Sequence, residues 1–398
     1  MSADPNARFR LGAPAVGALA SVALAAAGAV VLLKLRFDPH AASLAALAAA
    51  IALAPLIVGL RGTRRSKALQ LVAALLVTFA ALDGEAGVLF RPHVEVAGGG
   101  DFLARDPLLG FGPRPGAHAR VHWTLGGRTL YDASYGIGPD GFRLTRSNPA
   151  PDADTTVFLG DSYTFGDGLN DADTLSGQYA DARQGRERVI DAAFSGYGTH
   201  QALRLLQSDR LDHALGAGRR TFIYPMIEEH LERLAGKSPW EWFGTPRYGL
   251  DHGGVRYLGP FYPGLDGVVQ GLAWRSVLFT MLANQPTREP MTGSTELFGA
   301  MAAETRRLAQ TRYGGRFIVL LWDEPMLRDA QTPGRARRRA ARVDAIAAEL
   351  ARRGVETLRI STLIPDYPRR MAEYVIPVSG HPSAALNRRL ALELSRRL

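Results

Sequence analysis

Cysteine is absent from this chain of 398 residues. Disulfides and thiolate metal sites are therefore excluded, because both need cysteine sulfur. The absence does not decide the compartment, since an exported bacterial-type protein can do without bridges. Acidic residues are also fewer than basic ones, 38 against 47, which leaves a net charge of +9. Such a charge would permit contact with nucleic acid or anionic lipid if the basic residues gathered on one folded face.

Charged residues are missing from three stretches near the N-terminus. Residues 11–33 form an uncharged run of 23 residues, and residues 41–60 form a second run. The third, residues 68–82, reaches residue 90 if Asp83 and Glu85 lie at the membrane interface. Because about 20 apolar residues span a bilayer, we predict about three transmembrane helices within residues 1–90. A cleaved signal peptide is the alternative for the first run, but that run is too long and a second follows at once.

The orientation of these helices is predicted from the short loop "RGTRRSK", residues 61–67. Its four basic residues should stay in the cytoplasm, together with the basic N-terminus. Lys34 and Arg36 would then lie on the outer side, a minor conflict with the same rule. We therefore expect an integral protein of a bacterial inner membrane, with everything after Arg91 periplasmic or extracellular. That placement argues against a nucleic-acid partner despite the positive charge.

The pattern of polar and apolar residues changes twice in the rest of the chain. Residues 91–150 contain alternating polar and apolar residues with frequent Gly and Pro, as in "GGRTLYDASYGIGPDGFRL", and predict a short β-rich lead-in. Over residues 151–398, short apolar runs typical of buried parallel strands alternate with helical patterns. The runs are residues 155–160, 187–193, 220–226, 316–322 and 354–360, and the helical patterns are 171–184, 199–212, 296–312, 335–353 and 383–397. This alternation predicts a doubly wound α/β domain with helices on both faces of its sheet.

Two further segments of this domain differ from the alternating pattern in composition. Residues 236–292 break the alternation with Trp, Pro and Gly, so we interpret them as a lid-like insertion, in which "RYGLDHGGVRYLG" resembles a hairpin. The basic run "RARRRAAR", residues 335–342, is typical of a solvated helix face. An anionic lipid headgroup or an acidic glycan is the alternative ligand of that run.

Residues suited to acyl chemistry follow the predicted strands. Ser162, in "VFLGDSYTFGDGL", follows the first strand, Gly196 the second and His230 the third, while His381 precedes the last helix. In an open α/β sheet, ligands bind beyond the carboxyl ends of the strands, where these residues fall. Histidine suits the task of activating a serine near neutral pH, and the backbone N–H groups of Ser162 and Gly196 could hold an oxyanion. Taken alone, Ser162 also fits a turn that caps the next helix, with Asp161 bonding the amides of that turn.

These residues resemble the sequence blocks of the SGNH, or GDSL-type, hydrolases. The blocks "GDSY", "SGYGT" and "HPSA" occur in the family's order over residues 155–398, and "DPLLGFGPRPGAHA" with "YGIGPDGFR" resembles the region that precedes the domain in membrane-anchored members. The resemblance implies a flavodoxin-like three-layer fold that cleaves or transfers acyl esters. It also implies that Ser162 is the nucleophile, Gly196 the oxyanion glycine and His381 the general base.

The chain departs from the family pattern at the third block. That block normally supplies an Asn whose amide is the third oxyanion donor, and here the turn reads "MIEEHLER". We predict that His230 takes this place, because an imidazole N–H also donates, or that it instead pairs with Glu229 or Arg233. A shift of register would put Glu228 or Glu229 there instead.

A second departure concerns the acid of the triad. The family places an Asp two or three residues before its histidine, where this chain has Val378 and Ser379. We expect either a Ser-His dyad, with Ser379 in a supporting position, or a carboxylate borrowed from elsewhere. Asp366 and Glu373 are the nearest carboxylates in the sequence. Because loss of the acid in a serine hydrolase costs about 10⁴ in turnover, an inactive relative is a real alternative.

The sequence thus predicts a membrane-anchored serine esterase or O-acyltransferase. Its substrate would be an acyl ester of an envelope or extracellular glycan or lipid, and a membrane acyl donor could dock on the transmembrane helices, where small residues are frequent. The alternative is a weak or inactive module that binds an acylated or anionic envelope glycan. No cofactor is expected. No metal is expected either, since the acidic stretch "GDGLNDAD" lacks the spacing of a calcium loop.

Overall fold

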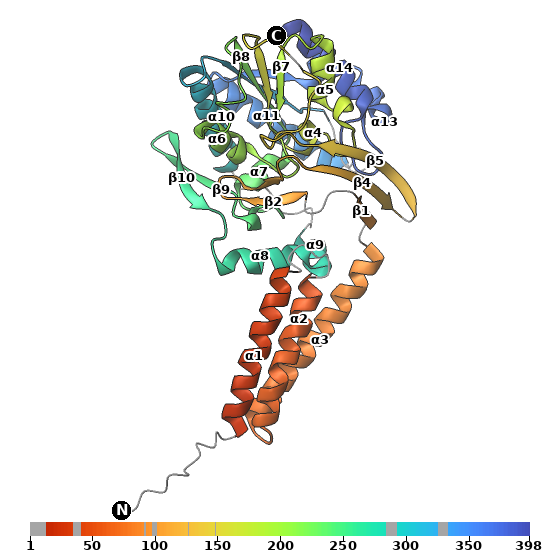
Figure 1. The fold of residues 1–398 in the computed structure, drawn as a ribbon, viewed down its shortest axis with the longest axis vertical. Helices are drawn as coiled ribbons and strands as arrows, with labels where there is room; N and C mark the ends of the chain where they lie inside the picture. The colour runs from red at the N-terminus through yellow and green to blue at the C-terminus, as the bar shows by residue number, and fades with distance from the viewer. Residues whose placement is uncertain are drawn as a thin grey trace, which may run out of the picture. The chain divides into compact units, whose positions relative to one another are not determined.

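The computed structural model describes most of the chain, and the described residues form two compact units (Figure 1). The first unit comprises the described parts of Met1–Arg91 and Gly264–Arg288, and the second those of Pro92–Pro263 and Glu289–Leu398. The described residues are 13–34, 41–90, 93–97, 102–125, 127–147, 149–283, 293–324 and 333–398.

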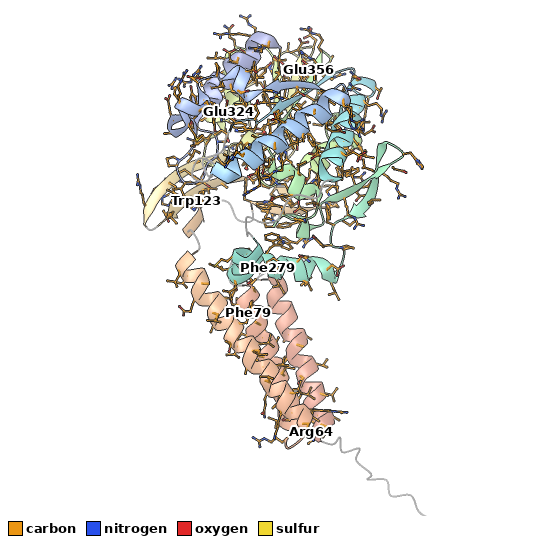
Figure 2. All side chains as sticks on the ribbon, turned by 180° about the vertical axis from the view of Figure 1, so that it is seen from behind. Arg64, Phe79, Trp123, Phe279, Glu324 and Glu356 are labelled. Atoms are coloured by element: carbon orange, nitrogen blue, oxygen red, sulfur yellow. The ribbon has the colours of Figure 1, made fainter. Side chains whose placement is uncertain are left out.

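The first unit is helical. It contains α1 (Ala13–Lys34), α2 (Ala41–Gly59), α3 (Arg64–Phe90), α8 (Leu265–Arg275) and α9 (Val277–Ala283). Two of the described helices, α2 and α3, are long and apolar enough to cross a membrane, and α1 contributes a shorter apolar stretch, Ala13–Gly28. Figure 2 labels Arg64 in the first turn of α3 and Phe79 further along it. Helices α1 and α2 pack closely, since a Cβ on Gly17 would lie 2.6 Å from the carbonyl oxygen of Pro55.

The second unit begins with the predicted β-rich lead-in. Strands β1 (His93–Ala97), β4 (His118–Leu125) and β5 (Arg128–Gly136) form an antiparallel sheet in the order β1-β4-β5. Strands β2 (Leu103–Asp106) and β3 (Gly110–Pro113) form a hairpin. The hairpin packs on the domain that follows, because the Tyr197 hydroxyl donates to the carbonyl oxygen of Phe111 at 2.8 Å.

A parallel sheet of five strands forms the centre of the second unit. Its strands are β6 (Thr155–Phe158), β7 (Arg188–Asp191), β8 (Arg220–Met226), β11 (Arg316–Leu321) and β12 (Glu356–Arg359), in the order β12-β11-β8-β6-β7. All five fall within the predicted apolar runs, which confirms the α/β prediction. Counted along the chain the order is 2-1-3-4-5, the strand order of flavodoxin-like folds. In such sheets the ligand lies where the strand order reverses, here beyond β6 and its neighbours.

Helices cover both faces of this sheet, because side chains on each strand alternate between two cores. Val157 of β6 and Phe222 of β8 belong to one core, while Phe158 and Ile223 belong to the other. The first core contains residues of α6 (Thr199–Gln207), α10 (Gly293–Thr311) and α11 (Pro333–Arg352), and the second contains residues of α5 (Leu175–Ala182) and α14 (Ala384–Arg397). Each predicted helical pattern therefore contributes to one layer of a three-layer domain.

Shorter elements complete the second unit. They are the helices α4 (Ser162–Phe165), α7 (Glu229–Leu234), α12 (Ile360–Leu363) and α13 (Met371–Tyr374), the 3₁₀ helices η1 (Asp171–Asp173), η2 (Glu241–Phe243) and η3 (Tyr367–Arg369), and the strands β9 (Pro246–Asp251) and β10 (Gly254–Pro260). The antiparallel pairing of β9 with β10 confirms the predicted hairpin.

Two interpretations of this region need correction. The segment at 236–292 is not one insertion in the second unit, since β9 and β10 belong to that unit and α8 and α9 pack with the N-terminal helices. The basic run at 335–342 is not wholly solvated either. Arg339 is buried and donates to the carbonyl oxygen of Trp322 at 3.0 Å, and Arg342 pairs with Glu228.

Candidate active site

Ser162 lies on the turn between β6 and α4. Gly160 has a φ of +130°, which lets the chain turn sharply after the strand. Asp161 caps α4, and its Oδ1 accepts a hydrogen bond from the Tyr163 amide at 3.0 Å. Ser162 is the first residue of that helix and remains 9% exposed. The turn therefore presents the serine hydroxyl at the carboxyl end of β6.

The structure brings His381 to this serine from the other end of the domain. His381 Nε2 lies 2.9 Å from Ser162 Oγ. The loop that carries the histidine is fixed on both sides: the Ile376 amide donates to the carbonyl oxygen of His381 at 2.8 Å, and the Tyr163 hydroxyl donates to that of Gly380 at 3.2 Å. The predicted nucleophile and base are thus within hydrogen-bond reach of each other.

The other ring nitrogen of His381 contacts a hydroxyl, not a carboxylate. Ser379 Oγ lies 2.9 Å from Nδ1 and also accepts the His381 amide at 3.3 Å. Val378, the residue before it, has a φ of +67°, so the chain turns tightly enough to place Ser379 under the ring. The carboxylates nearest in sequence have other partners: Asp366 accepts a hydrogen bond from Arg389 at 2.5 Å, and Glu373 pairs with Arg370 at 2.5 Å. Neither supports the histidine.

Asp167 is the carboxylate that the sequence reasoning missed. Its Oδ2 lies 4.0 Å from His381 Nε2, and its Oδ1 accepts a hydrogen bond of 2.5 Å from the Ser195 hydroxyl. The Asp167 amide donates to the carbonyl oxygen of Ser162 at 3.0 Å, which holds the carboxylate beside the turn. Burial raises the pKa of Asp167, while His381 and the Ser195 hydroxyl act against that rise. The acidic stretch after Ser162 was the available signal, but its composition fitted helix capping equally well.

Gly196 follows β7 in a conformation that needs glycine. Its φ is +88°, and a Cβ there would lie 2.4 Å from the indole of Trp240. A hydrogen bond of 3.2 Å from the Phe194 amide to the carbonyl oxygen of Gly160 ties this loop to the turn that carries Ser162. Among the described residues, neither the Ser162 amide nor the Gly196 amide donates a hydrogen bond to protein. Both N–H groups are therefore available to a developing oxyanion.

His230 does not have the position predicted for an oxyanion donor. Its ring is fully buried, with Nδ1 2.6 Å from the Tyr224 hydroxyl and Nε2 3.2 Å from Asp161 Oδ2. Burial lowers the pKa of His230, and Asp161 opposes that effect. Because both ring nitrogens face buried protein groups, the oxyanion assignment is corrected: His230 supports Asp161 beneath the serine turn. Glu228 pairs with Arg342 and does not replace it.

Arg233 joins the two loops that carry the candidate donors. Its Nη1 donates to Asp161 Oδ2 at 3.0 Å and also to the carbonyl oxygen of Tyr197, the residue after Gly196. Burial alone would raise the pKa of Asp161, but Arg233 and His230 outweigh it and hold that pKa well below 3.8. A buried ionic network therefore fixes the loop of Ser162 against the loop of Gly196.

The described ranges contain no group of three or more His, Cys, Asp or Glu side chains that could hold a metal ion. The groups placed around Ser162 are a base, a hydroxyl, a carboxylate and two backbone amides. They can transfer protons and stabilise negative charge on an oxygen.

Comparison with known proteins gives little beside this geometry. No protein-family model and no curated protein match the chain. Among solved structures, the chain is similar to the psychrotrophic esterase EstA from Pseudoalteromonas sp., inhibited by monoethylphosphonate, at 12% sequence identity. That likeness covers 61% of this chain and 94% of the esterase, with a TM-score of 0.34. At this TM-score it supports no statement about the present chain, and the arrangement around Ser162 remains the evidence for a function.

Proposed function

We propose that the chain is a serine hydrolase of the SGNH type, an esterase or an O-acyltransferase. The observation that carries the proposal is the 2.9 Å contact between Ser162 Oγ and His381 Nε2. A serine with a base in reach, beside two amides without protein partners, is suited to nucleophilic attack on an ester.

The reaction would proceed in two steps. In the first, Ser162 Oγ attacks the acyl carbon while His381 Nε2 takes the hydroxyl proton, and the amides of Ser162 and Gly196 bind the oxyanion. The C–O bond to the leaving alcohol then breaks, and His381 returns the proton to that alcohol, which leaves an acyl-serine. In the second step His381 takes a proton from water or from an acceptor hydroxyl, whose oxygen attacks the acyl carbon. The bond between the acyl carbon and Ser162 Oγ then breaks, and His381 returns the proton to Ser162 Oγ.

The two tasks of a triad acid are divided in this mechanism. An acid at Nδ1 holds the imidazole in the right tautomer and stabilises the imidazolium that forms. Here the Ser379 hydroxyl oxygen, 2.9 Å from Nδ1, would accept a hydrogen bond from the Nδ1–H group and so fix the tautomer. Asp167, 4.0 Å from Nε2, would supply the negative charge.

The proposed setting is the outer side of a bacterial inner membrane. The length and composition of α2 and α3, and the four basic residues at 61–67, support a membrane anchor with a cytoplasmic N-terminus. The catalytic unit would then act on acyl esters of an envelope or extracellular glycan or lipid. A membrane protein that donates acyl groups is the corresponding proposed partner.

The test uses the full-length protein in nanodiscs. We expect hydrolysis of short p-nitrophenyl esters and covalent labelling by a fluorophosphonate, with both lost in Ser162→Ala. The matched control is Ser395→Ala, because Ser395 lies in α14 and its hydroxyl donates to the carbonyl oxygen of Leu392 within the same helix. Ester hydrolysis by Ser162→Ala at the parent rate would overturn the proposal.

A second function is favoured by one observation: no carboxylate of the described residues lies at Nδ1 of His381, where Ser379 Oγ lies instead. On that basis the domain would be a catalytically weak module that binds an acylated or anionic envelope glycan. Complete resistance of Ser162 to the fluorophosphonate, with retained binding of an acylated glycan, would favour this alternative.

A further inference from the structure

Asp83 is a buried carboxylate within the apolar helix α3, and three groups bond it. It is only 2% exposed. Its Oδ2 accepts from the Ser43 hydroxyl of α2 at 3.0 Å. Its Oδ1 accepts from the Ser276 hydroxyl at 2.7 Å and from the Leu278 amide at 3.1 Å, at the start of α9. Asp83 therefore fastens α9, and the helix α8 before it, to the N-terminal helices.

The position of this fastening along the helices is defined by its partners. Ser43 lies in the first turn of α2, and Asp83 lies in the second half of α3. Both are at the end of the helical bundle opposite the basic loop at 61–67 that joins α2 to α3. Figure 1 shows α8 and α9 at this end, with α8 running across the bundle and not along it. If α2 and α3 cross a bilayer, α8 runs parallel to its outer surface.

Helix α8 has one buried side. Gly267 and Gly271, four residues apart, are its buried residues, and the helix contacts α2. Spacing of i and i+4 puts both glycines on one face, where missing side chains permit close packing of helix backbones. The first unit itself therefore buries this face of α8.

A second side of α8 is apolar and exposed. Leu265, Val268 and Val269 have the i, i+3, i+4 spacing of one helix face, and they are 81%, 50% and 62% exposed. Asp266 and Gln270, also four residues apart, form a third, polar side. A helix with a buried side, an exposed aliphatic side and a polar side fits a boundary between water and an apolar medium.

The same unit exposes further aliphatic side chains. Large aliphatic side chains of α3 are also exposed, among them Leu82 at 57%, Val88 at 74% and Leu89 at 71%. These belong to the same half of α3 as Asp83. Helix α8 contacts α2, which is long and apolar enough to span a membrane, and this contact indicates lipid as the occupant of the exposed aliphatic side.

We infer that α8 is an interfacial helix that lies in the outer leaflet of the membrane, with Leu265, Val268 and Val269 among the acyl chains. Trp274 and Arg275 end the helix, and residues of these types anchor membrane proteins at the headgroup level. The chain then returns to the membrane at residues 264–283, and Asp83 holds this segment there. This inference concerns lipid contact and stands whether or not the protein hydrolyses esters.

The absence of cysteine makes the test direct. Single cysteines replace Leu265, Val268 or Val269 on the aliphatic side, and Asp266 or Gln270 on the polar side, in the full chain. Each is labelled with a nitroxide in nanodiscs of phosphatidylethanolamine and phosphatidylglycerol. Collision with oxygen, which partitions into lipid, is compared with collision with a water-soluble nickel chelate.

We expect the oxygen-to-nickel collision ratio to be at least severalfold higher on the aliphatic side than on the polar side. Equal ratios on the two sides, with nickel reaching both, would overturn the inference. Low collision with both reagents at Val268 and Val269 would also overturn it, because a protein surface would then cover this side.

A second pair of variants tests the fastening by Asp83. Asp83→Leu removes the acceptor for Ser276 and Leu278, so we expect the nitroxide at position 269 to become more mobile and more accessible to nickel. Glu85→Gln is the control, since Glu85 is an exposed acidic residue on the same helix. An unchanged nitroxide spectrum in Asp83→Leu would contradict the role given to Asp83.

Discussion

Asp167 Oδ2 lies 4.0 Å from His381 Nε2, the ring nitrogen that also contacts Ser162 Oγ. A triad acid ordinarily bonds the opposite nitrogen, Nδ1, so this carboxylate approaches the histidine from the side of the reaction. It cannot select the tautomer from there, since Nε2 must be free to accept the serine proton. It can stabilise the positive ring that follows, because an opposite charge at this distance favours the charged form.

Asp167→Asn should therefore lower the rate of catalysis. Without the carboxylate, the imidazolium that forms when His381 takes the serine proton loses an opposite charge at 4.0 Å. We expect kcat for p-nitrophenyl esters to fall roughly tenfold, which corresponds to a loss of about 1.4 kcal/mol of transition-state stabilisation. A kcat equal to that of the parent would exclude this role.

Ser379→Asp should improve the site. It places a carboxylate near Nδ1, where the hydroxyl is now 2.9 Å away, and adds charge stabilisation to the existing control of the tautomer. We expect a severalfold rise in kcat. Ser379→Asn, similar in size but uncharged, should not raise kcat, and Ser379→Ala should lower it. If Asp and Asn gave the same kcat, the charge at Nδ1 would be irrelevant.

The sequence was sufficient for the α/β fold and for the approach of Ser162 to His381. The parallel strands were predicted because each lies in a short apolar run, and β6, β7, β8 and β11 are largely buried. Ser162 and His381 were predicted because they flank such elements in a known order. Their meeting at 2.9 Å follows from the parallel sheet, which gathers the ends of its strands at one edge.

The remaining site residues depended on directions that a sequence pattern does not give. Asp167 points at His381 only because Gly166 ends α4 with a φ of +83° and turns the chain back. His230 follows its strand as predicted, yet the first turn of α7 directs the ring beneath Ser162, and one residue more would rotate it by about 100°. Helix α8 belongs with α2, a partner too distant in the sequence for local periodicity to reveal.

Gly196→Ala should destabilise the protein more than a backbone effect explains. The residue has a φ of +88°, and the new Cβ would lie 2.4 Å from Trp240. Gly185→Ala is the matched control, because φ is +66° there and the nearest atom is 3.9 Å away. Left-handed strain alone costs about 1–2 kcal/mol, and overpacking adds about 1–3 kcal/mol at Gly196 only. Equal losses in urea unfolding would show that Trp240 moves aside.

Arg233→Met should destabilise the protein more than removal of the charges of both Arg233 and Asp161 does. It leaves Asp161 buried without its cation, and breaking a buried pair costs about 3–5 kcal/mol. Adding Asp161→Asn removes the uncompensated charge, so the double variant should regain part of the stability. Urea unfolding of the parent, both single variants and the double variant measures the coupling. Additive losses would contradict a direct interaction between the two residues.

Asp191 should make stability fall as pH rises. Burial raises the pKa of this β7 carboxyl to about 7, although the Ser176 hydroxyl donates to it at 2.6 Å. In the unfolded chain the pKa is about 3.9, so between these values the folded state holds a proton that the unfolded state has lost. The contribution of Asp191 to the free energy of unfolding is greatest below about pH 3.9. It declines by up to about 1.4 kcal/mol for each pH unit between about 3.9 and about 7.

Asp191→Asn removes that dependence, because an amide does not ionise. We expect the variant to be within about 1 kcal/mol of the parent at pH 5, since the amide oxygen can still accept a hydrogen bond, and more stable than the parent at pH 8. Asp152→Asn is the control, because Asp152 is exposed and should leave the pH dependence unchanged. Free energies of unfolding in urea at pH 5, 6, 7 and 8 decide the matter. A constant difference between variant and parent would mean that Asp191 is already ionised at pH 5 in the folded protein.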